Sequence, residues 1–457
     1  MMIHKYKLNG FNIVLDVNSG GVHIVDDLTY DLLDNVEPPF DEKCPQKVLD
    51  KLSRSYLPED IETCYEEIVE LYNDKILFSE DDYEKYAKYS VASPVKSMCL
   101  NIAHDCNLRC KYCFASTGDF GTGRKLMTFE TGKHAIDFLL ENSGDRPTLE
   151  LDFFGGEPLM NFGVVKQIVE YARSREAEYK KKFRFTITTN GVLLDDDKID
   201  FINKEMSNVV LSIDGRKKVN DDMRVRVDGS GSYDSILPKF KKLVSKRGDK
   251  EYYVRGTYTN KNLDFADDVF SLYNEGFDQI SVEPVMSEDP EFALSEKDLP
   301  EIFKEYEELA RRMIENEKKG GKFNFFHFMI DLDQGPCAVK RLRGCGCGND
   351  YVAITPDGDI YPCHQFVGKD EFKMGNIDEG TFDQKMKEDF AKAHIYNKPE
   401  CKKCWAKFYC SGGCNANNFN FNGDIHSAYK LSCEIEKKRV ECAIMLKAIR
   451  IFGEQEQ

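Results

Sequence analysis

Three cysteines near the end of the first quarter of the chain have a spacing that suits an iron–sulfur cluster. Cys106, Cys110 and Cys113 form a CxxxCxxC motif shortly after an apolar run, residues 98–103, that predicts a strand. Short-spaced thiolates are the ligands of such clusters. Three of them leave one iron of a four-iron cubane open to a ligand other than cysteine. The alternatives are scattered buried thiols or a zinc knuckle, for which His104 is the only close fourth ligand.

A second, larger group of cysteines lies between residues 337 and 433. Cys345 precedes Gly358 by thirteen positions, and four residues separate Gly358 from Cys363. A zinc ribbon explains one CxxC pair but not this number of thiolates. The rest of the pattern is Cys401-x2-Cys404-x5-Cys410-x3-Cys414 and a final Cys433.

Composition limits where such a protein works and what it binds. The chain has 457 residues, which predicts two or three domains, and its net charge of −17 argues against a nucleic-acid partner. Neither an export signal nor an apolar run of membrane-spanning length is visible, so we expect a cytoplasmic protein. Sixteen cysteines are then read as metal ligands before disulfides, although Cys64 and Cys442 fit the pattern of buried structural thiols.

Residues 1–85 form a predicted small module of their own. Residues 11–17 and 21–25 read as two strands joined by a hairpin, and helices are predicted near 27–35, 46–55 and 59–75. This is a winged-helix pattern, but no basic recognition helix for DNA is visible. An exposed strand edge that captures an extended peptide is the second interpretation, and a structural cap on the next domain is the third.

The chain from about 95 to 320 alternates strands with helices, which predicts an α/β fold with a parallel sheet in a partial (β/α)6 barrel. Chemistry in such a fold lies where strands end, and the polar motifs follow this rule. A Cys-rich domain, 335–440, and a C-terminal helix, 441–457, complete the expected order. Strands are predicted at 98–103, 149–154, 183–189, 209–214, 253–258 and 280–285, and helices near 128–142, 162–181, 195–205, 233–247, 264–275 and 296–318.

The CxxxCxxC motif, followed by the GGEP loop at residues 155–158, resembles the radical S-adenosylmethionine (SAM) superfamily over residues 98–290. The resemblance implies that SAM binds the open iron and yields a 5′-deoxyadenosyl radical, which takes a hydrogen atom from the substrate. The implied roles are cluster ligation by Cys106, Cys110 and Cys113 and SAM binding by Tyr112, Gly155, Gly156, Glu157, Ser212 and Arg224. Each of the residues implied in SAM binding also has a purely structural alternative: simple packing for Tyr112, a strand-end hydroxyl for Ser212, a surface ion pair for Arg224 and a tight turn for GGEP.

The downstream cysteines resemble the SPASM domain, which carries two auxiliary [4Fe–4S] clusters, so three clusters are expected in all. The resemblance implies an outer cluster on Cys401, Cys404, Cys410 and Cys433. The inner cluster would bind Cys345, Cys363 and Cys414. Its fourth ligand stays open between Cys337, Cys347 and a thiolate of the substrate.

Nearly the whole chain resembles maturases of SCIFF peptides, which are short, ribosomally made and Cys-rich. The motifs that carry this resemblance are residues 335–337, 340–342, 344–346 and 359–366. It implies a sactionine-type reaction, in which a peptide cysteine sulfur joins a carbon of an acceptor residue, which we expect to be threonine. Residues 1–85 would hold the leader peptide as an added strand. An electron donor such as flavodoxin or ferredoxin and an anaerobic host are expected.

Other activities stay open at this stage. A maturase similar to those of sulfatases would make formylglycine, and a quinone-cofactor or mycofactocin type would join carbons or decarboxylate a peptide. A DNA-binding iron–sulfur sensor is the non-enzymatic alternative, and the net charge of −17 opposes it.

Overall fold

The computed structural model describes residues 2–87, 92–330, 332 and 338–452. The N-terminal module is an antiparallel sheet in the order β1-β2-β3 with three helices beside it. The predicted strands and helices of this module are confirmed, whereas β1 was not predicted. Pro58 begins the longest helix of this module, at a position where its missing N–H costs nothing. The elements are β1 (Ile3–Leu8), β2 (Phe11–Asp16), β3 (Val22–Val25), α1 (Asp27–Leu32), α2 (Gln46–Leu52) and α3 (Pro58–Asn73).

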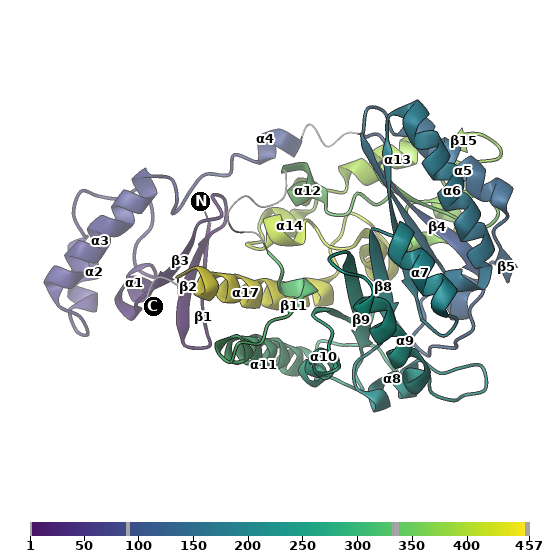
Figure 1. Cartoon of the computed structure of the whole chain (residues 1–457). Coiled ribbons are helices and arrows are strands. Elements are labelled where there is room, and N and C mark those ends of the chain that lie inside the picture. The colour runs from purple at the N-terminus through teal and green to yellow at the C-terminus, as the bar shows by residue number, and fades with distance from the viewer. Residues whose placement is uncertain (1, 88–91, 331, 333–337, 453–457) are drawn as a thin grey trace.

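All six predicted barrel strands are present, and each is parallel to its neighbour (Figure 1). The predicted helices follow them, and α8 (Lys217–Met223) and the short β5 (Lys125–Leu126) and β11 (Asn324–Phe325) are additional. The strands are β4 (Ser97–His104), β6 (Thr148–Gly155), β7 (Lys182–Thr189), β8 (Asn208–Ser212), β9 (Glu251–Tyr258) and β10 (Gln279–Pro284). The helices are α5 (Phe129–Asn142), α6 (Phe162–Tyr179), α7 (Asp196–Glu205), α9 (Tyr233–Ser245), α10 (Phe265–Asn274) and α11 (Leu299–Lys318).

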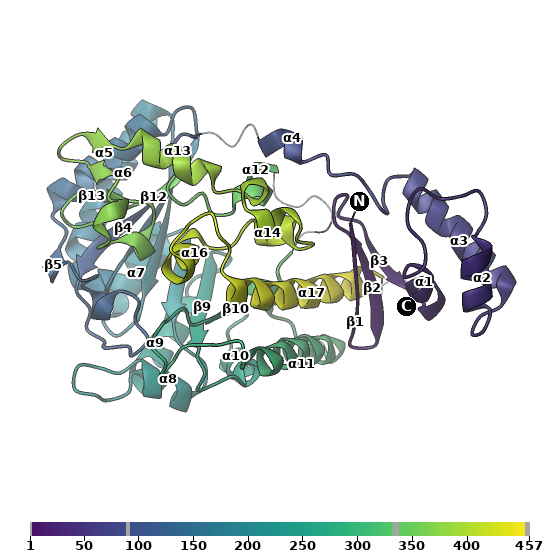
Figure 2. The same cartoon turned by 180° about the vertical axis from the view of Figure 1, so that it is seen from behind.

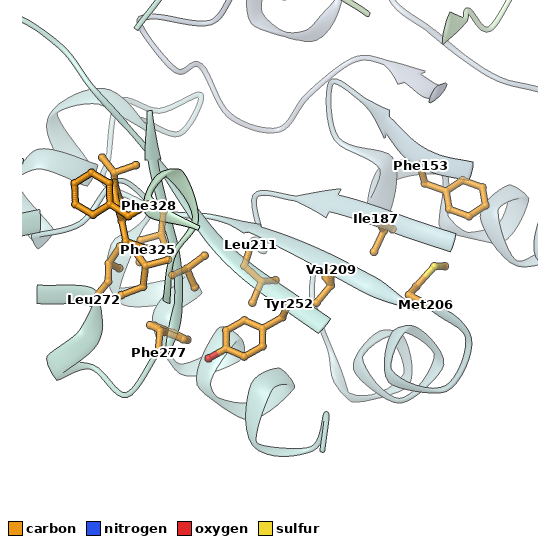
Figure 3. Close-up of a cluster of buried hydrophobic side chains, with 14 of the residues drawn as sticks. Phe153, Ile187, Met206, Val209, Leu211, Tyr252, Leu272, Phe277, Phe325 and Phe328 are labelled. Carbon is orange, nitrogen blue, oxygen red and sulfur yellow. The ribbon is translucent and has the colours of Figure 1, made fainter. Parts of the chain in front are cut away.

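Alternation along the strands separates the core from the cavity. In β7, Phe183, Phe185 and Ile187 are buried, whereas Thr186 and Thr188, which alternate with them, are half-buried. Successive strand side chains point to opposite faces, so the apolar set packs under the helices and the polar set faces the barrel interior. Figure 3 shows part of this apolar layer, with Ile187, Val209, Leu211 and Tyr252 among its residues.

The Cys-rich region continues the barrel sheet, which the sequence did not predict. Strand β12 (Tyr351–Ile354) pairs in parallel with β4, and the next three strands extend the sheet in antiparallel fashion. Local patterns cannot reveal a partner strand some 250 residues away. The other elements are β13 (Asp359–Tyr361), β14 (Gly375–Asn376), β15 (Thr381–Phe382), α12 (Ala338–Arg343), α13 (Gln384–Lys392), α14 (Pro399–Lys402), α15 (Lys407–Cys410) and α16 (Asn415–Asn422), with α4 (Glu84–Ala87) preceding the barrel.

The last helix, α17 (Lys430–Phe452), connects all three parts of the molecule. It lies along α11 and reaches the N-terminal sheet (Figures 1 and 2). The hydroxyl of Tyr6 donates to the Glu441 carbonyl at 2.8 Å, and the His4 ring stacks on Trp405 at 3.7 Å. The expected boundary at 440/441 therefore falls inside one continuous helix. Within the described chain, no helix is long and apolar enough to cross a membrane.

Candidate functional site

The three cysteines of the first motif line one cavity at the carboxyl ends of the barrel strands, together with the GGEP loop, Ser212 and Arg224. The loop that carries them is fixed by the segment after α8. The amide of Arg109 donates to the Val225 carbonyl at 2.7 Å, and that of Lys111 to Met223 at 3.0 Å. Helix α8 thus explains how a loop of mixed polarity keeps its cysteines together.

Glycines let the neighbouring loops approach the cysteine loop closely. Gly155 has φ +115°, and a Cβ on it would lie 2.4 Å from the Ala103 carbonyl oxygen. A Cβ on Gly156 would lie 2.1 Å from the carbonyl oxygen of Asp105, and one on Gly118 would lie 2.7 Å from Cys106 Cβ. Any side chain at these positions would push the loops apart, so a glycine-lined cradle surrounds the thiols.

The chemistry of the thiols fits a cluster. Burial raises the pKa of Cys106 and of Cys110 to about 12, so these thiols are protonated until a metal displaces the proton. In the described part of the chain, no three Cys, His, Asp or Glu side chains converge on one point as a single metal ion requires. A [4Fe–4S] cubane would spread its thiolates around several iron atoms.

Glu157 is buried and ties two strand ends together. Its Oε1 accepts from the Thr189 hydroxyl at 2.7 Å and from the Leu159 amide at 3.0 Å, and its Oε2 accepts from the Asn190 amide at 2.8 Å. Burial raises the pKa of Glu157 to about 7. The Asn190 side chain lies 3.5 Å from the Cys106 sulfur, a contact that the sequence pattern alone did not indicate.

Asp214 organises the opposite wall and was missed as a functional residue. It is fully buried and accepts from the Tyr112 hydroxyl at 2.6 Å and from Arg224 Nε at 2.9 Å. The Arg224 guanidinium lies 5.6 Å from the Tyr112 ring centre. Burial lowers the pKa of Arg224, but the charges of Asp214, Tyr112 and Cys110, together with the hydrogen bond to Asp214, outweigh burial and raise this pKa above its ordinary value. The ion pair of Arg224 is therefore internal, not on the surface, and Ser212 lines the cavity beside it.

The remaining wall of the cavity carries a charged pair and aromatic rings. Arg255 on β9 donates to Glu283 on β10 at 2.6 Å. From the Cys-rich domain, His364 packs its ring 4.8 Å from Phe154 and 5.4 Å from Phe114. Burial lowers the pKa of His364 to about 4, so its ring is neutral at pH 7. A substrate in this cavity would touch both the barrel and the Cys-rich domain.

The downstream cysteines form two groups. Within each group, the thiols lie near enough to influence one another's pKa. The outer group is the expected one, Cys401, Cys404, Cys410 and Cys433. The inner group contains the expected Cys345, Cys363 and Cys414, and also Cys347.

Cys347 lies beside the expected cysteines of the inner group. The thiols of Cys347 and Cys363 are both buried and in contact. Burial raises the pKa of Cys347, and the hydrogen bond from the Cys347 thiol lowers the pKa of Cys363. The Gly348 amide donates to the Pro362 carbonyl at 3.0 Å, which holds the two backbones together. The other candidate, Cys337, lies outside the described residues.

Both cysteine regions match models of known protein families. Residues 100–282 match the radical SAM superfamily, and residues 345–405 match the SPASM iron–sulfur cluster-binding domain. A cysteine-type anaerobic sulfatase-maturating enzyme of Clostridium novyi is 26% identical over 68% of this chain and 86% of its own length.

Two solved structures share the fold. Native anSMEcpe with bound AdoMet and Kp18Cys peptide superposes with a TM-score of 0.65 at 21% identity, over 78% of this chain and 99% of its own. Streptococcus suis SuiB bound to precursor peptide SuiA has a TM-score of 0.51 at 16% identity, over 94% of this chain and 98% of its own. The second match includes the N-terminal module in its extent.

Proposed function

We propose that this radical SAM enzyme, whose SPASM domain follows the barrel, forms an intramolecular thioether in a ribosomally made, Cys-rich precursor peptide. The observation that carries the proposal is the shared cavity. Cys106, Cys110 and Cys113 lie on one side of it, and His364 and Gln365, next to Cys363, lie on another. A peptide bound there is within reach of both cluster sites at once.

The barrel residues hold and orient the cofactor in this proposal. Cys106, Cys110 and Cys113 bind the first cluster, and Tyr112, Gly155, Gly156, Glu157, Ser212 and Arg224 surround SAM. When bound, the cluster and SAM supply a radical that removes a hydrogen atom from the substrate. The buried pair of Asp214 and Arg224 keeps that wall rigid, and Glu157 holds the ends of β6 and β7 in register.

The substrate faces the polar side of the same cavity. Arg255 and Glu283 form a charged pair there, with side chains 44% and 32% exposed, and the rings of Phe114 and Phe154 flank His364. The charged pair suits hydrogen bonds to peptide groups, and the rings suit an apolar stem. Fixing the sulfur and the acceptor carbon close together is what bond formation requires.

The N-terminal module is the proposed leader-binding site. Strand β3 is an edge of its sheet, and a groove runs between β3 and α3. An edge strand with a groove beside it can add an extended peptide as a further strand. The groove is lined by Val14, His23, Ile24, Val25, Asp26, Thr29, Leu33, Cys64, Glu67, Ile68, Leu71 and Leu77.

Formation of formylglycine is the second candidate, favoured by the similarity to the sulfatase-maturating enzyme. Formation of a carbon–carbon bond is the third. Mass spectrometry separates the three. The test incubates the reconstituted enzyme anaerobically with SAM, a reductant and a synthetic peptide encoded by a short Cys-rich reading frame beside its gene. The product is then reduced and alkylated.

A thioether predicts loss of two hydrogens and one fewer alkylated cysteine. A carbon–carbon link also loses two hydrogens but leaves every cysteine free. Formation of formylglycine from cysteine replaces the sulfur by oxygen and also loses two hydrogens. The control enzyme carries alanine at Cys106, Cys110 and Cys113 and should leave the peptide unchanged. An unmodified peptide with the parent enzyme, despite SAM cleavage, would refute the thioether proposal.

A further inference from the structure

One lysine is completely buried between the two auxiliary cysteine groups. Lys398, directly before α14, is 0% exposed. Its Nζ donates to the Gly412 carbonyl at 2.9 Å and to Asn415 Oδ1 at 3.0 Å. Both acceptors lie on the short segment 410–415. This segment contains Cys410 of the outer group and Cys414 of the inner group. The ammonium therefore lies at the junction between the two sites.

A glycine in the backbone allows the close contact between Lys398 and the segment 410–415. Gly412 has φ +90°, and a Cβ on it would lie 3.4 Å from Lys398 Nζ. A side chain at this position would contact the ammonium and would be strained by the positive φ. Glycine thus serves both the left-handed turn and the approach of the charge.

Lys398 has no carboxylate partner within the described residues, unlike the buried Lys407 nearby. Lys407, also nearly fully buried, pairs with Asp81 at 2.6 Å. A buried ammonium with only neutral acceptors is costly unless an anion lies near. Burial lowers the pKa of Lys398, and the groups around it that oppose this effect by supplying negative charge are the thiols of Cys401, Cys410, Cys414 and Cys433.

We propose that Lys398 is the internal counter-ion of both auxiliary clusters and raises their reduction potentials. A cluster with its thiolates is anionic, and reduction adds a further negative charge. A fixed positive charge nearby stabilises the reduced form more than the oxidised form. Higher potentials make the clusters better acceptors of the electron that thioether formation releases. This inference rests on the cluster assignment of the proposed function but not on the peptide product.

The test is a potentiometric titration of the auxiliary clusters, followed by electron paramagnetic resonance, in the full chain reconstituted without peptide. Parent, Lys398→Met, Lys398→Gln and Lys407→Met proteins are compared at equal iron content. Repeating the set in the Cys106/Cys110/Cys113→Ala background separates the auxiliary signals from the first cluster. The methionine keeps the length and apolar stem of lysine, whereas the glutamine keeps a donor for Gly412.

Both Lys398 variants should show more negative auxiliary potentials, so that at a fixed potential the ratio of reduced to oxidised cluster falls at least about threefold. Lys407→Met leaves the Asp81 carboxylate, which is partly exposed to solvent, so any shift of the potentials should be smaller than in the Lys398 variants. Unchanged potentials in the Lys398 variants would overturn the proposal. So would an equal shift in Lys407→Met, or loss of auxiliary iron in both Lys398 variants, which would make Lys398 a support of the ligand loop. None of these readouts depends on which bond the enzyme forms within its peptide substrate.

Discussion

The hydroxyl of Tyr112 donates a hydrogen bond of 2.6 Å to the buried carboxylate of Asp214. Tyr112 belongs to the cysteine loop, and Asp214 follows the end of β8. The second carboxylate oxygen accepts from Arg224 and from the amide of Thr257. One carboxylate therefore joins the loop of the first cluster to two strand ends and to the arginine proposed to contact SAM.

Replacing this carboxylate tests the connection. Asp214→Asn leaves the buried Arg224 without its counter-charge, and removing one partner of a buried pair destabilises strongly. We expect the free energy of unfolding to fall by about 3 kcal/mol and SAM affinity to fall at least about tenfold. Thermal unfolding and equilibrium SAM binding to the cluster-loaded protein measure the two effects.

Asp264→Asn is the matched control for that change. Asp264 pairs with Arg216 at 2.8 Å, but its side chain is 56% exposed. Exposed pairs contribute little, so the expected loss is below about 1 kcal/mol with unchanged SAM binding. Equal effects of the two substitutions would show that Asp214 has no special place in the site.

The fourth ligand of the inner cluster is tested by Cys347→Ala. Because Cys347 lies with Cys363 in the inner group, its loss should open one iron of that cluster and change its magnetic resonance signal. Cys337→Ala should leave that signal unchanged. The reverse pattern would assign the ligand to Cys337 and leave Cys347 as a buried neighbour.

Leader binding is tested by a single side chain, because deletion of residues 1–85 would also remove Tyr6 and Leu8 from the main core. Leu71→Lys places a charge in the groove beside β3. Losing one buried leucine contact corresponds to at least about tenfold weaker binding of the precursor. Fluorescence anisotropy of a labelled leader measures it. Leu57→Lys, at a site 67% exposed on the same module, should bind like the parent. Equal affinities for both variants would place the leader elsewhere.

Much of the barrel could be predicted because its information is local. Alternating apolar residues and short breaks identify β4, β6, β7, β8, β9 and β10, and parallel strands bring their carboxyl ends to one edge. The cysteine loop, the GGEP loop and Ser212 therefore meet as expected in one cavity.

Long-range pairing and buried polar partners could not be predicted. Nothing near Tyr351 indicates that β12 joins β4, and Asp214 resembles any strand-end aspartate until its three partners are seen. Spacing also failed to separate Cys345 from Cys347, because both precede Gly358 at acceptable distances. Only the fold shows that both lie in the same group.

The stability of the protein should depend on pH through Glu157. Its folded pKa of about 7 exceeds the ordinary value, so the folded state holds this proton more tightly than the unfolded state. The resulting stabilisation is complete below about pH 4 and is lost as pH rises to 7. Glu157→Gln lacks this titration. Between pH 5 and pH 8 the parent should therefore lose up to about 3 kcal/mol of unfolding free energy relative to the variant. This loss is measured as a change in the difference between their Tm values. A difference that does not change with pH would contradict the raised pKa.

Magnetic resonance of the first cluster on addition of SAM tests the central claim most directly. The protein is reconstituted anaerobically and reduced, and spectra are recorded with and without SAM, in the parent and in the Cys106/Cys110/Cys113→Ala variant. A cluster held by only these three cysteines predicts a changed spectrum in the parent and none in the variant. Identical parent spectra with and without SAM would contradict an open iron and, with it, the chemistry proposed for this cavity.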